Sequence, residues 1–420
     1  MIYLIQWLRN SQNNTDMKIK TILFCAAALL TVSTPLSAQK KKAKEAEPKG
    51  YQFTTQIELP VTSIKNQASS GTCWAFSSVS FFESEILKNG YAGDLDLSEM
   101  FFISHAYQDR AEKFVRLHGA LEFGGGSSFG NVLQIMKKYG AVPESEMPGL
   151  NYGTDKHRHG ELDALARAYV NVMIKNPNKK LSTAWKNGFK GIMDAYLGPI
   201  PETFEAEGKE YTPKSYMESL GIDLDDYVDI VSWTHVPYYE KTVQLVPDNW
   251  IWEEAYNVPL DELVEIINNA LSSGYTVAWA SDVSENGFSR AGLGIVPDYE
   301  AMKEAAKETG TDEARWIGAK PEELKSKALE GPCPELEITP ELRQEGYDTY
   351  QTTDDHGMHI YGKAADQNGK PYFIVKNSWG EAGDYKGIWY VSEAYVRYKT
   401  MDILVNKKAI PAHIREKLGL

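Results

Sequence analysis

Cysteine is scarce in this chain, with three residues among 420. Secreted proteins that depend on disulfide bonds carry more cysteines, usually in even numbers. Cys25 falls in an apolar stretch near the N-terminus, which leaves Cys73 and Cys333 in the body of the chain. The low count argues against a disulfide framework, although a single Cys73–Cys333 bond remains open as an alternative.

Positive charge and long apolar runs are also in short supply. Lys and Arg number 44 against 58 Asp and Glu, which gives a net charge of −14. Binding to nucleic-acid phosphates needs a basic surface, so we expect no nucleic-acid partner. No apolar run of about 20 residues follows residue 40, so we expect no stable membrane span once an N-terminal signal is removed.

Metal-ligand patterns are missing as well. The eight His are scattered along the chain, and Cys73 and Cys333 lack the spacing of zinc ligands. His157 and His159 form a lone pair that we expect to be solvated rather than metal-bound. The sequence therefore predicts no metal and no cofactor.

The N-terminal segment has the features of an export signal. Lys18 and Lys20 follow Met17, an apolar stretch runs over 21–32, and small residues at 35–39 offer a cleavage site. We therefore expect an exported protein, periplasmic or secreted. Its leader would comprise a signal peptide over 1–39, in which 1–16 is a possible mis-assigned leader, and a flexible charged segment over 40–50.

The rest of the chain divides by the period of its apolar residues. With 42% hydrophobic residues it is long enough for a sizeable core. Apolar residues at three- and four-residue steps predict a helix that starts at Cys73 and ends at Gly90, and others follow Ser98 and precede Gly140. We expect one domain over 51–420, made of a helical half (51–150), a helical insertion (160–330), a β-rich half (331–406) and a C-terminal arm (407–420).

A hairpin in the β-rich half brings two polar residues together. His356–Ala365 and Tyr372–Asn377 read as strands that flank an Asn-Gly turn. If Ala365 pairs with Lys370, Met358 lies opposite Asn377, and His356 becomes a diagonal neighbour of Asn377 on one face. A slip of one residue would break this inference.

The segment Asn66–Ser77 carries the strongest chemical signal. It places the Cys73 thiol at the start of a helix, where unpaired N–H groups and the helix dipole favour a thiolate and can hold an oxyanion. The Gln67 amide lies six residues upstream as a second donor. A thiolate nucleophile also needs a base, and that base needs an orienting group. His356 and Asn377 can supply these roles, with His359 as the competing histidine.

Each of these residues has an ordinary structural reading when it is taken alone. A Cys followed by Trp is usually core, and His, Asn and Gln are usually surface or turn residues. Together, the three motifs Asn66–Ser78, Asp355–Met358 and Val375–Gly380, in that order, resemble the papain superfamily of cysteine peptidases. The long spacing from Cys73 to His356 resembles the bleomycin hydrolase / aminopeptidase C branch.

This resemblance implies an α+β fold with a helical domain, an antiparallel barrel-like domain and a large helical insertion. It implies that Cys73 is the nucleophile, His356 the base and then the acid, Asn377 the orienting residue and Gln67 the oxyanion donor. Gly125, Gly126 and Trp379 resemble substrate-binding positions, with Trp379 shielding the His–Asn contact.

The function that follows is an exported cysteine peptidase that acts on peptides through a Cys73 acyl-enzyme. By resemblance it is an aminopeptidase and forms a homo-oligomer, a hexamer in this branch. In the relatives a C-terminal arm anchors the free amine of the substrate. The tail over 407–420 looks shorter here, so an endopeptidase or a dipeptidase is one alternative. A non-catalytic binding protein with a papain fold is the other.

Overall fold

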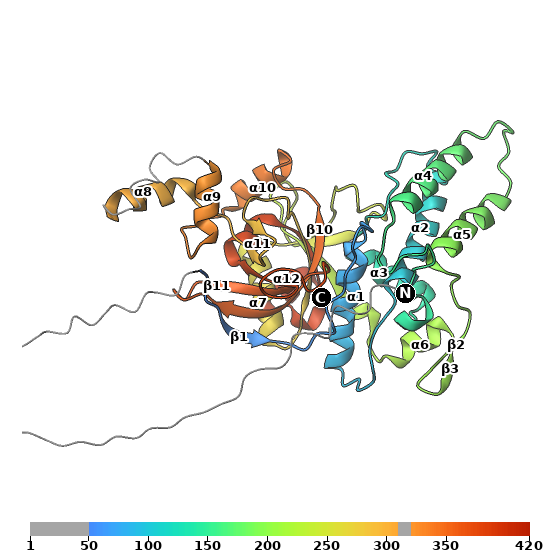
Figure 1. Cartoon of the computed structure of the whole chain (residues 1–420), viewed down its shortest axis with the longest axis horizontal. Helices are drawn as coiled ribbons and strands as arrows, with labels where there is room; N and C mark the ends of the chain where they lie inside the picture. The colour runs from blue at the N-terminus through green and yellow to red at the C-terminus, as the bar shows by residue number, and fades with distance from the viewer. Residues whose placement is uncertain (1–49, 310–320) are drawn as a thin grey trace, which may run out of the picture. The chain divides into compact units, whose positions relative to one another are not determined.

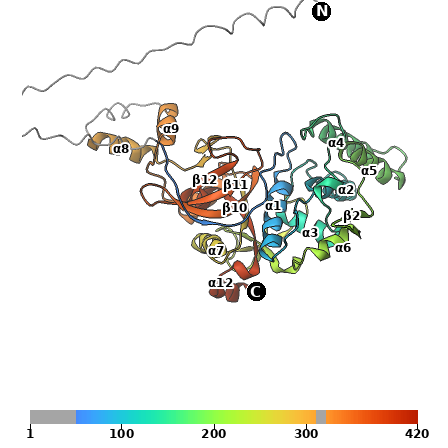
Figure 2. The ribbon, with the colours of Figure 1, turned by 60° about the horizontal axis from the view of Figure 1, so that its bottom comes forward.

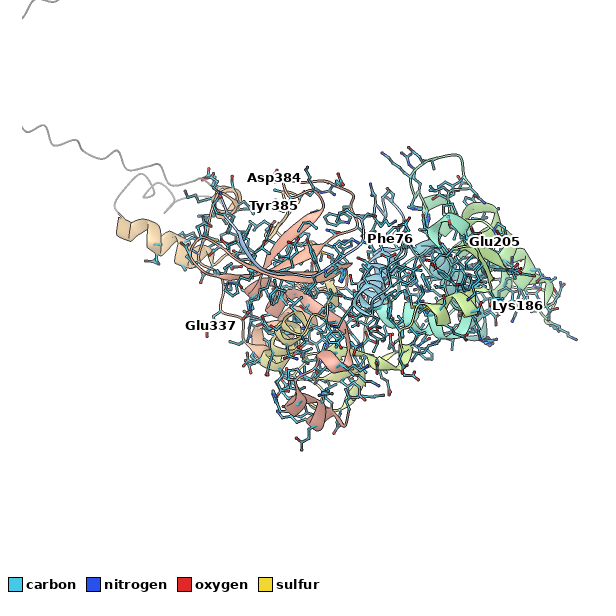
Figure 3. All side chains as sticks on the ribbon, turned by 90° about the horizontal axis from the view of Figure 1, so that it is seen from below. Phe76, Lys186, Glu205, Glu337, Asp384 and Tyr385 are labelled. Carbon is cyan, nitrogen blue, oxygen red and sulfur yellow. The ribbon has the colours of Figure 1, made fainter. Side chains whose placement is uncertain are left out.

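Helix α1 (Cys73–Lys88) lies between a helical part and a large sheet in the computed structural model, which describes residues 50–309 and 321–420. The two ribbon views agree on this arrangement (Figures 1 and 2). Figure 3 shows Phe76 of α1 with Asp384 on the sheet side and Lys186 on the helical side. Residues 74–86 of α1 are all buried, as expected for a helix covered on every side.

The helical part follows the predicted boundaries closely. The Ser98 side chain accepts a hydrogen bond from the Phe101 N–H at the start of α2, and Gly140 ends α3 with a φ of +94°. These residues confirm the predicted helix limits. The helices after α1 are α2 (Glu99–Arg116), α3 (Phe129–Tyr139), α4 (Gly160–Ile174), α5 (Ala184–Leu197), α6 (Pro213–Ser219), α7 (Leu260–Ser272), α8 (Tyr299–Thr309), α9 (Pro321–Leu329), α10 (Pro340–Asp348), α11 (Glu393–Lys399) and α12 (Ala412–Leu418).

One eleven-stranded sheet forms the β-rich part, in the order β5-β6-β4-β13-β7-β10-β11-β12-β9-β8, with β1 also paired to β10. Adjacent strands of this sheet are antiparallel, except for the parallel pairs β4–β6 and β9–β12. The strands are β1 (Thr54–Glu58), β4 (Tyr227–Val231), β5 (Lys241–Val243), β6 (Glu254–Asn257), β7 (Val277–Ser281), β8 (Phe288–Ser289), β9 (Leu293–Gly294), β10 (His356–Ala365), β11 (Pro371–Lys376), β12 (Ile388–Ser392) and β13 (Thr400–Asn406), and β2 (Phe204–Ala206) pairs with β3 (Lys209–Tyr211) separately.

The segment 160–330 differs from the expected helical insertion. It holds helices α4 to α9, but it also gives β4, β6 and β7 to the central sheet. These strands pair with β13 and β10, which come from the C-terminal third of the chain. The β-rich run at 275–280 predicts β7, but pairing between distant segments leaves no local signal in the sequence, so β4 and β6 were not predicted.

The β10–β11 hairpin forms with a register that differs at the turn. Ala365 pairs with Pro371 rather than with Lys370, so the predicted pairing is wrong there. A bulge between Ile360 and Gly362 then shifts the register by one residue. Beyond it His359 pairs with Lys376, which is the predicted register. The bulge therefore restores the predicted alignment next to His356.

The C-terminal residues pack against α7, as Figure 2 shows. The last strand ends at Asn406, as predicted, and a short turn leads into α12. The Asn269 side chain donates a hydrogen bond of 2.7 Å to the Ala409 carbonyl, and Lys417 pairs with Glu262 at 2.6 Å. Ile414 and Leu418 are buried in the core beneath.

The predicted signal peptide, its leader and Cys25 lie outside the described residues. Within 50–309 and 321–420, no helix combines the length and the apolar character that crossing a bilayer requires.

Candidate active site

Cys73 is the first residue of α1. The carbonyl of the preceding Thr72 accepts hydrogen bonds from the N–H groups of Ala75 and Phe76, which closes the first turn. The backbone N–H of Trp74 interacts with the Cys73 thiol. The thiol therefore lies among the free N–H groups of a helix N-terminus, which favour negative charge.

The start of β10 lies directly against the first turns of α1. A Cβ on Gly357 would stand 2.6 Å from the Ser77 Oγ and 3.4 Å from the Cys73 carbonyl oxygen. Glycine is needed here for space, because the contact leaves no room for a side chain. This close approach brings His356 and the N–H of Gly357 to Cys73.

His356 is held by the next strand of the hairpin. Its Nε2 lies 2.8 Å from Asn377 Oδ1, which also accepts a 2.7 Å hydrogen bond from the Ser378 N–H. Because the amide oxygen can only accept, it favours the tautomer with a proton on Nε2 and leaves Nδ1 for the thiol. The indole of Trp379 lies 4.8 Å from the imidazole, centroid to centroid.

The competing histidine has another environment. His359 Nδ1 lies 2.9 Å from the Ser80 Oγ, and the side chain is buried between β10 and α1. The structure therefore brings His356, and not His359, to Asn377.

Gln67 lies on the segment that leads into α1. Its N–H donates to the Ser378 carbonyl at 2.8 Å, and its Oε1 accepts a 2.6 Å hydrogen bond from the Ser378 hydroxyl. With Oε1 engaged, Nε2 is left as a donor. The resemblance assigns this Nε2 and the Cys73 N–H to the oxyanion.

Burial shifts the pKa values of both Cys73 and His356. It raises the pKa of the Cys73 thiol to about 12, although the N–H groups of Gly357 and Trp74 act in the opposite direction. It lowers the pKa of His356 to about 4, against the hydrogen bond to Asn377 and the charge of Asp355. A single charge on either group is disfavoured, whereas a proton that passes from Cys73 to His356 creates two opposite charges that stabilise each other.

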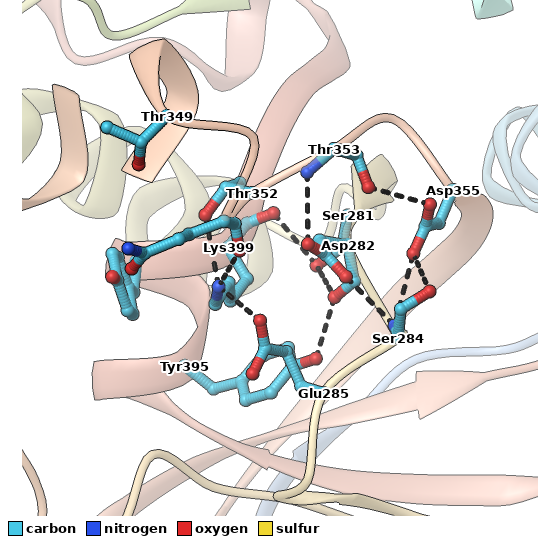
Figure 4. Close-up of polar contacts among 12 residues, drawn as sticks. Ser281, Asp282, Ser284, Glu285, Thr349, Thr352, Thr353, Asp355, Tyr395 and Lys399 are labelled. Atoms are coloured by element: carbon cyan, nitrogen blue, oxygen red, sulfur yellow. Dashed lines mark hydrogen bonds and ion pairs between the residues drawn. The ribbon is translucent and has the colours of Figure 1, made fainter. Parts of the chain in front are cut away.

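A hydrogen-bond network fixes the loop before His356 (Figure 4). Asp355 accepts hydrogen bonds from Ser284 and from the Thr353 hydroxyl, and Asp282 accepts from the Thr353 N–H at 3.0 Å. Lys399 donates to the Gln351 carbonyl at 2.6 Å. Burial acts to raise the pKa of Asp355, but its hydrogen bonds together hold that pKa below its usual range. The loop is thus tied to the segment that follows β7 and to the end of α11.

The glycine segment adjoins the nucleophile through Trp74. The Trp74 indole donates a 2.8 Å hydrogen bond to the Gly125 carbonyl. A Cβ on Gly126 would stand 2.0 Å from an oxygen of Asp248. Gly125 and Gly126 therefore lie beside the cleft, where the resemblance places the substrate backbone.

Cys73 and His356 line a cleft with about 550 Å³ of space outside the protein atoms. Sequence reasoning missed another part of its lining, where carboxyl groups gather. We call these residues the acidic pocket: Asp229, Asp248, Glu253, Asp354 and Asp402. They come from separate segments, so no spacing rule could have found them. None of residues 407–420 lines the cleft.

The structure bears on two further expectations from the sequence. Cys73 and Cys333 are both free thiols, so the alternative disulfide does not form in the structure. The prediction that His157 and His159 are solvated is wrong, because His159 is fully buried and His157 packs edge-on to Phe76 at 5.7 Å between centroids. Both flank the Ser69 backbone, whose N–H donates to the His157 carbonyl. They help to hold the segment that leads to Cys73.

Comparisons with known proteins agree over most of the chain. The sequence profile of the Peptidase C1-like family matches residues 5–318 and 340–419. Aminopeptidase C of Streptococcus thermophilus is 22% identical over 402 residues, covering 86% of this chain and 84% of the relative. Aminopeptidase G of Lactobacillus delbrueckii subsp. lactis is 23% identical over 406 residues, covering 86% and 85%. The crystal structure of PepW from Lactobacillus rhamnosis matches with a TM-score of 0.64 at 22% identity, over 87% of this chain and 84% of that chain.

Proposed function

Because this chain belongs to the Peptidase C1-like family, we propose that it is an exported cysteine aminopeptidase that releases N-terminal residues from peptides through an acyl-enzyme at Cys73. The family confirms the predicted resemblance and the cysteine-peptidase class, and the PepW match confirms the α+β fold. The aminopeptidase specificity rests on the names of the relatives.

The contact between His356 and Asn377 is the observation that carries the chemistry. The Cys73 sulfur attacks the scissile carbonyl carbon while its proton passes to His356. Gln67 Nε2 and the Cys73 N–H hold the resulting oxyanion. His356 then protonates the leaving amine as the carbon–nitrogen bond breaks, which leaves a thioester on Cys73.

Water completes the cycle. His356, now neutral, takes a proton from a water molecule that attacks the thioester carbonyl, and the same oxyanion donors serve again. The carbon–sulfur bond breaks, the released acid leaves and the thiol regains its proton. Asn377 keeps the imidazole oriented through both halves of the reaction, and it is a positioning residue.

A second candidate is a dipeptidase or an endopeptidase. Residues 407–420 pack on α7 and do not line the cleft, so they leave its far end free. The cleft adjoins a second hollow with about 920 Å³ of space outside the protein atoms, and the two share Val246, Asp248 and Asp354. Such room suits a substrate that extends further towards its N-terminus.

A comparison of free and blocked peptides separates these candidates. Fluorogenic aminoacyl amides with a free amine should be hydrolysed faster than their N-acetyl counterparts. Preference for the blocked substrates would overturn the aminopeptidase reading and favour the second candidate. No labelling of Cys73 by a thiol-directed affinity probe under reducing conditions would instead favour the predicted alternative of a non-catalytic binding protein.

Export rests on the N-terminal sequence, where a basic start precedes an apolar stretch and small residues. N-terminal sequencing of the mature protein tests it, and a first residue upstream of Ala38 would contradict it. The hexamer that the resemblance implies stays a prediction, which the molar mass in solution would check.

A further inference from the structure

The acidic pocket has more carboxyl groups than positive partners. None of Asp229, Asp248, Glu253, Asp354 and Asp402 takes part in an ion pair within the described part of the chain. Asp248, Asp354 and Asp402 are half-buried, and their carboxyl groups accept no hydrogen bond from the described residues. A carboxylate removed from water is stable only when it is paired or hydrogen-bonded.

Asp229 points more directly to a missing partner. The residue is 6% exposed, it lines the cleft, and its Oδ1 has no hydrogen-bond partner among the described residues. The same carboxyl group shares a hydrogen bond with the carboxyl group of Glu253, and the charge of Asp402 also acts on it. Glu253 accepts a further hydrogen bond of 3.2 Å from the Ser128 hydroxyl. An unpaired oxygen in such a place costs free energy unless a donor occupies the cleft.

Two glycines make room for these carboxyl groups. A Cβ on Gly126 would stand 2.0 Å from an Asp248 oxygen, and one on Gly130 would stand 1.6 Å from a Glu253 oxygen. Neither glycine has a positive φ, so the backbone does not require glycine at either position. The absence of a side chain at these two positions leaves space for a carboxyl group.

The two nearby cations have partners of their own. Arg110 acts on Asp248, and its Nε and Nη1 donate to the carbonyls of Glu122, Gly124 and Gly126, whereas its buried Nη2 has no hydrogen-bond partner among the described residues. Lys137 acts on Glu253 from a neighbouring hollow that Asp229 and Glu253 also line, and its Nζ pairs with Asp225 at 2.7 Å. Neither cation lines the cleft, so the space in front of the carboxyl groups is free for another.

The pocket lies next to the reacting thiol. Asp354 and Asp248 are near enough to act electrostatically on Cys73, and Asp354 is two residues from His356. Gln67, Asn377 and Trp379 do not line the cleft, so the pocket extends away from the side where Trp379 flanks His356. A peptide that reacts at Cys73 can therefore place one of its groups among the carboxyl groups.

We propose that the acidic pocket binds an ammonium or guanidinium group of the peptide on the N-terminal side of the scissile bond. This inference rests on the proposed peptidase function and deepens it. Two sources can supply the cation: the free α-amine of the substrate, or a Lys or Arg side chain one residue further towards the N-terminus. Either would bind as a charge-assisted hydrogen-bond partner of Asp229 and its neighbours.

Four coumarin amides test the proposal: alanyl, N-acetyl-alanyl, N-acetyl-lysyl-alanyl and N-acetyl-norleucyl-alanyl. We expect kcat/KM to be about 10- to 100-fold higher for a substrate with the cation than for its neutral counterpart, the range of a hydrogen bond between charged groups. Comparing the alanyl with the N-acetyl-alanyl amide tests binding of the α-amine. Comparing the lysyl-alanyl with the norleucyl-alanyl amide tests binding of the side-chain cation. Asp402→Asn and Glu253→Gln should each reduce the preference, measured as the ratio of kcat/KM between the cationic and the neutral substrate of each pair.

Glu254→Gln is the matched control, because Glu254 neighbours Glu253 but is exposed and does not line the cleft. It should keep the full preference. Hydrolysis without any preference for a cation would overturn the acidic-pocket proposal and leave the peptidase function intact, as would an equal loss of activity on all four substrates in both variants. No hydrolysis of any of them by the wild-type protein would count against the proposed function itself.

Discussion

Gly357 of β10 lies so close to Ser77 of α1 that a Cβ on the glycine would stand 2.6 Å from the serine Oγ. Phe129 closes the same space, with its ring 3.0 Å from that Cβ. The contact joins the strand that carries His356 to the helix that carries Cys73. The distance between the two parts of the site is therefore set by a residue without a side chain.

We predict that Gly357→Ala lowers kcat/KM by about 100-fold, because a displacement of about 1 Å between reacting groups has an effect of that size. The backbone of Gly357 does not have a positive φ, so the effect comes from crowding. Adding Ser77→Ala removes the nearer atom and should restore part of the activity. Gly191→Ala is the control, because nothing lies within 4 Å of its Cβ. Full activity of Gly357→Ala would show that the contact does not set the geometry.

Cys73→Ala should abolish both hydrolysis and labelling by a thiol-directed affinity probe. The thiol is the group that would form the acyl-enzyme, and no other described residue at the cleft offers a sulfur nucleophile. Cys333→Ala serves as the control, since Cys333 interacts with the Tyr51 hydroxyl and does not line the cleft. Hydrolysis at the normal rate by Cys73→Ala would refute the proposed mechanism.

Gln67→Ala should lower kcat by about 10²- to 10³-fold with little change in KM, the usual effect of removing one oxyanion donor. Ser378→Ala, which frees the Gln67 Oε1, should have a smaller effect of the same kind. Alkylation of Cys73 by iodoacetamide creates no oxyanion, so its rate should be unchanged in Gln67→Ala. A matching loss in the alkylation rate would instead assign Gln67 a structural role.

The preference for a cationic substrate should rise with pH. Burial and the charge of Glu253 raise the pKa of Asp402 to about 7, and burial also raises the pKa values of Asp229, Asp354 and Asp248. Below about pH 6 the pocket holds more protons and attracts a cation less. The charged groups outside the pocket that act on it are Arg110 and Glu122 on Asp248, Asp355 on Asp354, and Lys137 on Glu253.

The ratio of kcat/KM for N-acetyl-lysyl-alanyl to that for N-acetyl-norleucyl-alanyl isolates this effect, because the ionisation of Cys73 and His356 cancels in the ratio. We expect the ratio to increase between about pH 6 and about pH 8. A ratio that is flat in wild type and equally flat in Asp402→Asn would contradict the expected role of this carboxyl group.

Asp402→Asn should make the folded protein more stable at alkaline pH. Its carboxyl pKa is about 7 when folded, against 3.8 as the reference value, so the folded state holds the proton more tightly. Wild-type stability therefore falls as pH rises from about 4 to about 7, and the asparagine variant avoids that loss. Its Tm should exceed that of wild type at about pH 8, by about 2–4 °C for each kcal/mol gained, and match it at about pH 4. A lower Tm at about pH 8 would mean that the carboxylate makes a favourable contact.

The sequence predicted the parts of the fold that depend on local pattern. The apolar steps from Cys73 gave α1, Ser98 and Gly140 marked helix ends, and the Asn-Gly pair gave the β10–β11 hairpin. The bulge at Tyr361 was not predictable, because β10 is buried on both faces and so shows no alternation that would mark a change of register.

The acidic pocket was also beyond the sequence. Asp229, Glu253 and Asp402 come from or adjoin strands β4, β6 and β13, which meet only through long-range pairing. Acidic residues are common in a chain with 58 of them, so none of these stood out. The one local signal was the pair Asp354 and Asp355 directly before His356. The motif that carries the resemblance includes Asp355 but not Asp354.

The bulge between Ile360 and Gly362 has a consequence for variation in this chain. It lies between the turn at 366–370 and the end of β10 that carries His356. At the bulge the pairing of β10 with β11 already shifts by one residue. A residue gained or lost at the turn can therefore be absorbed before it reaches the histidine. The tip of this hairpin is accordingly a place where length can change, or a peptide tag can be inserted, while the imidazole keeps its partner on β11.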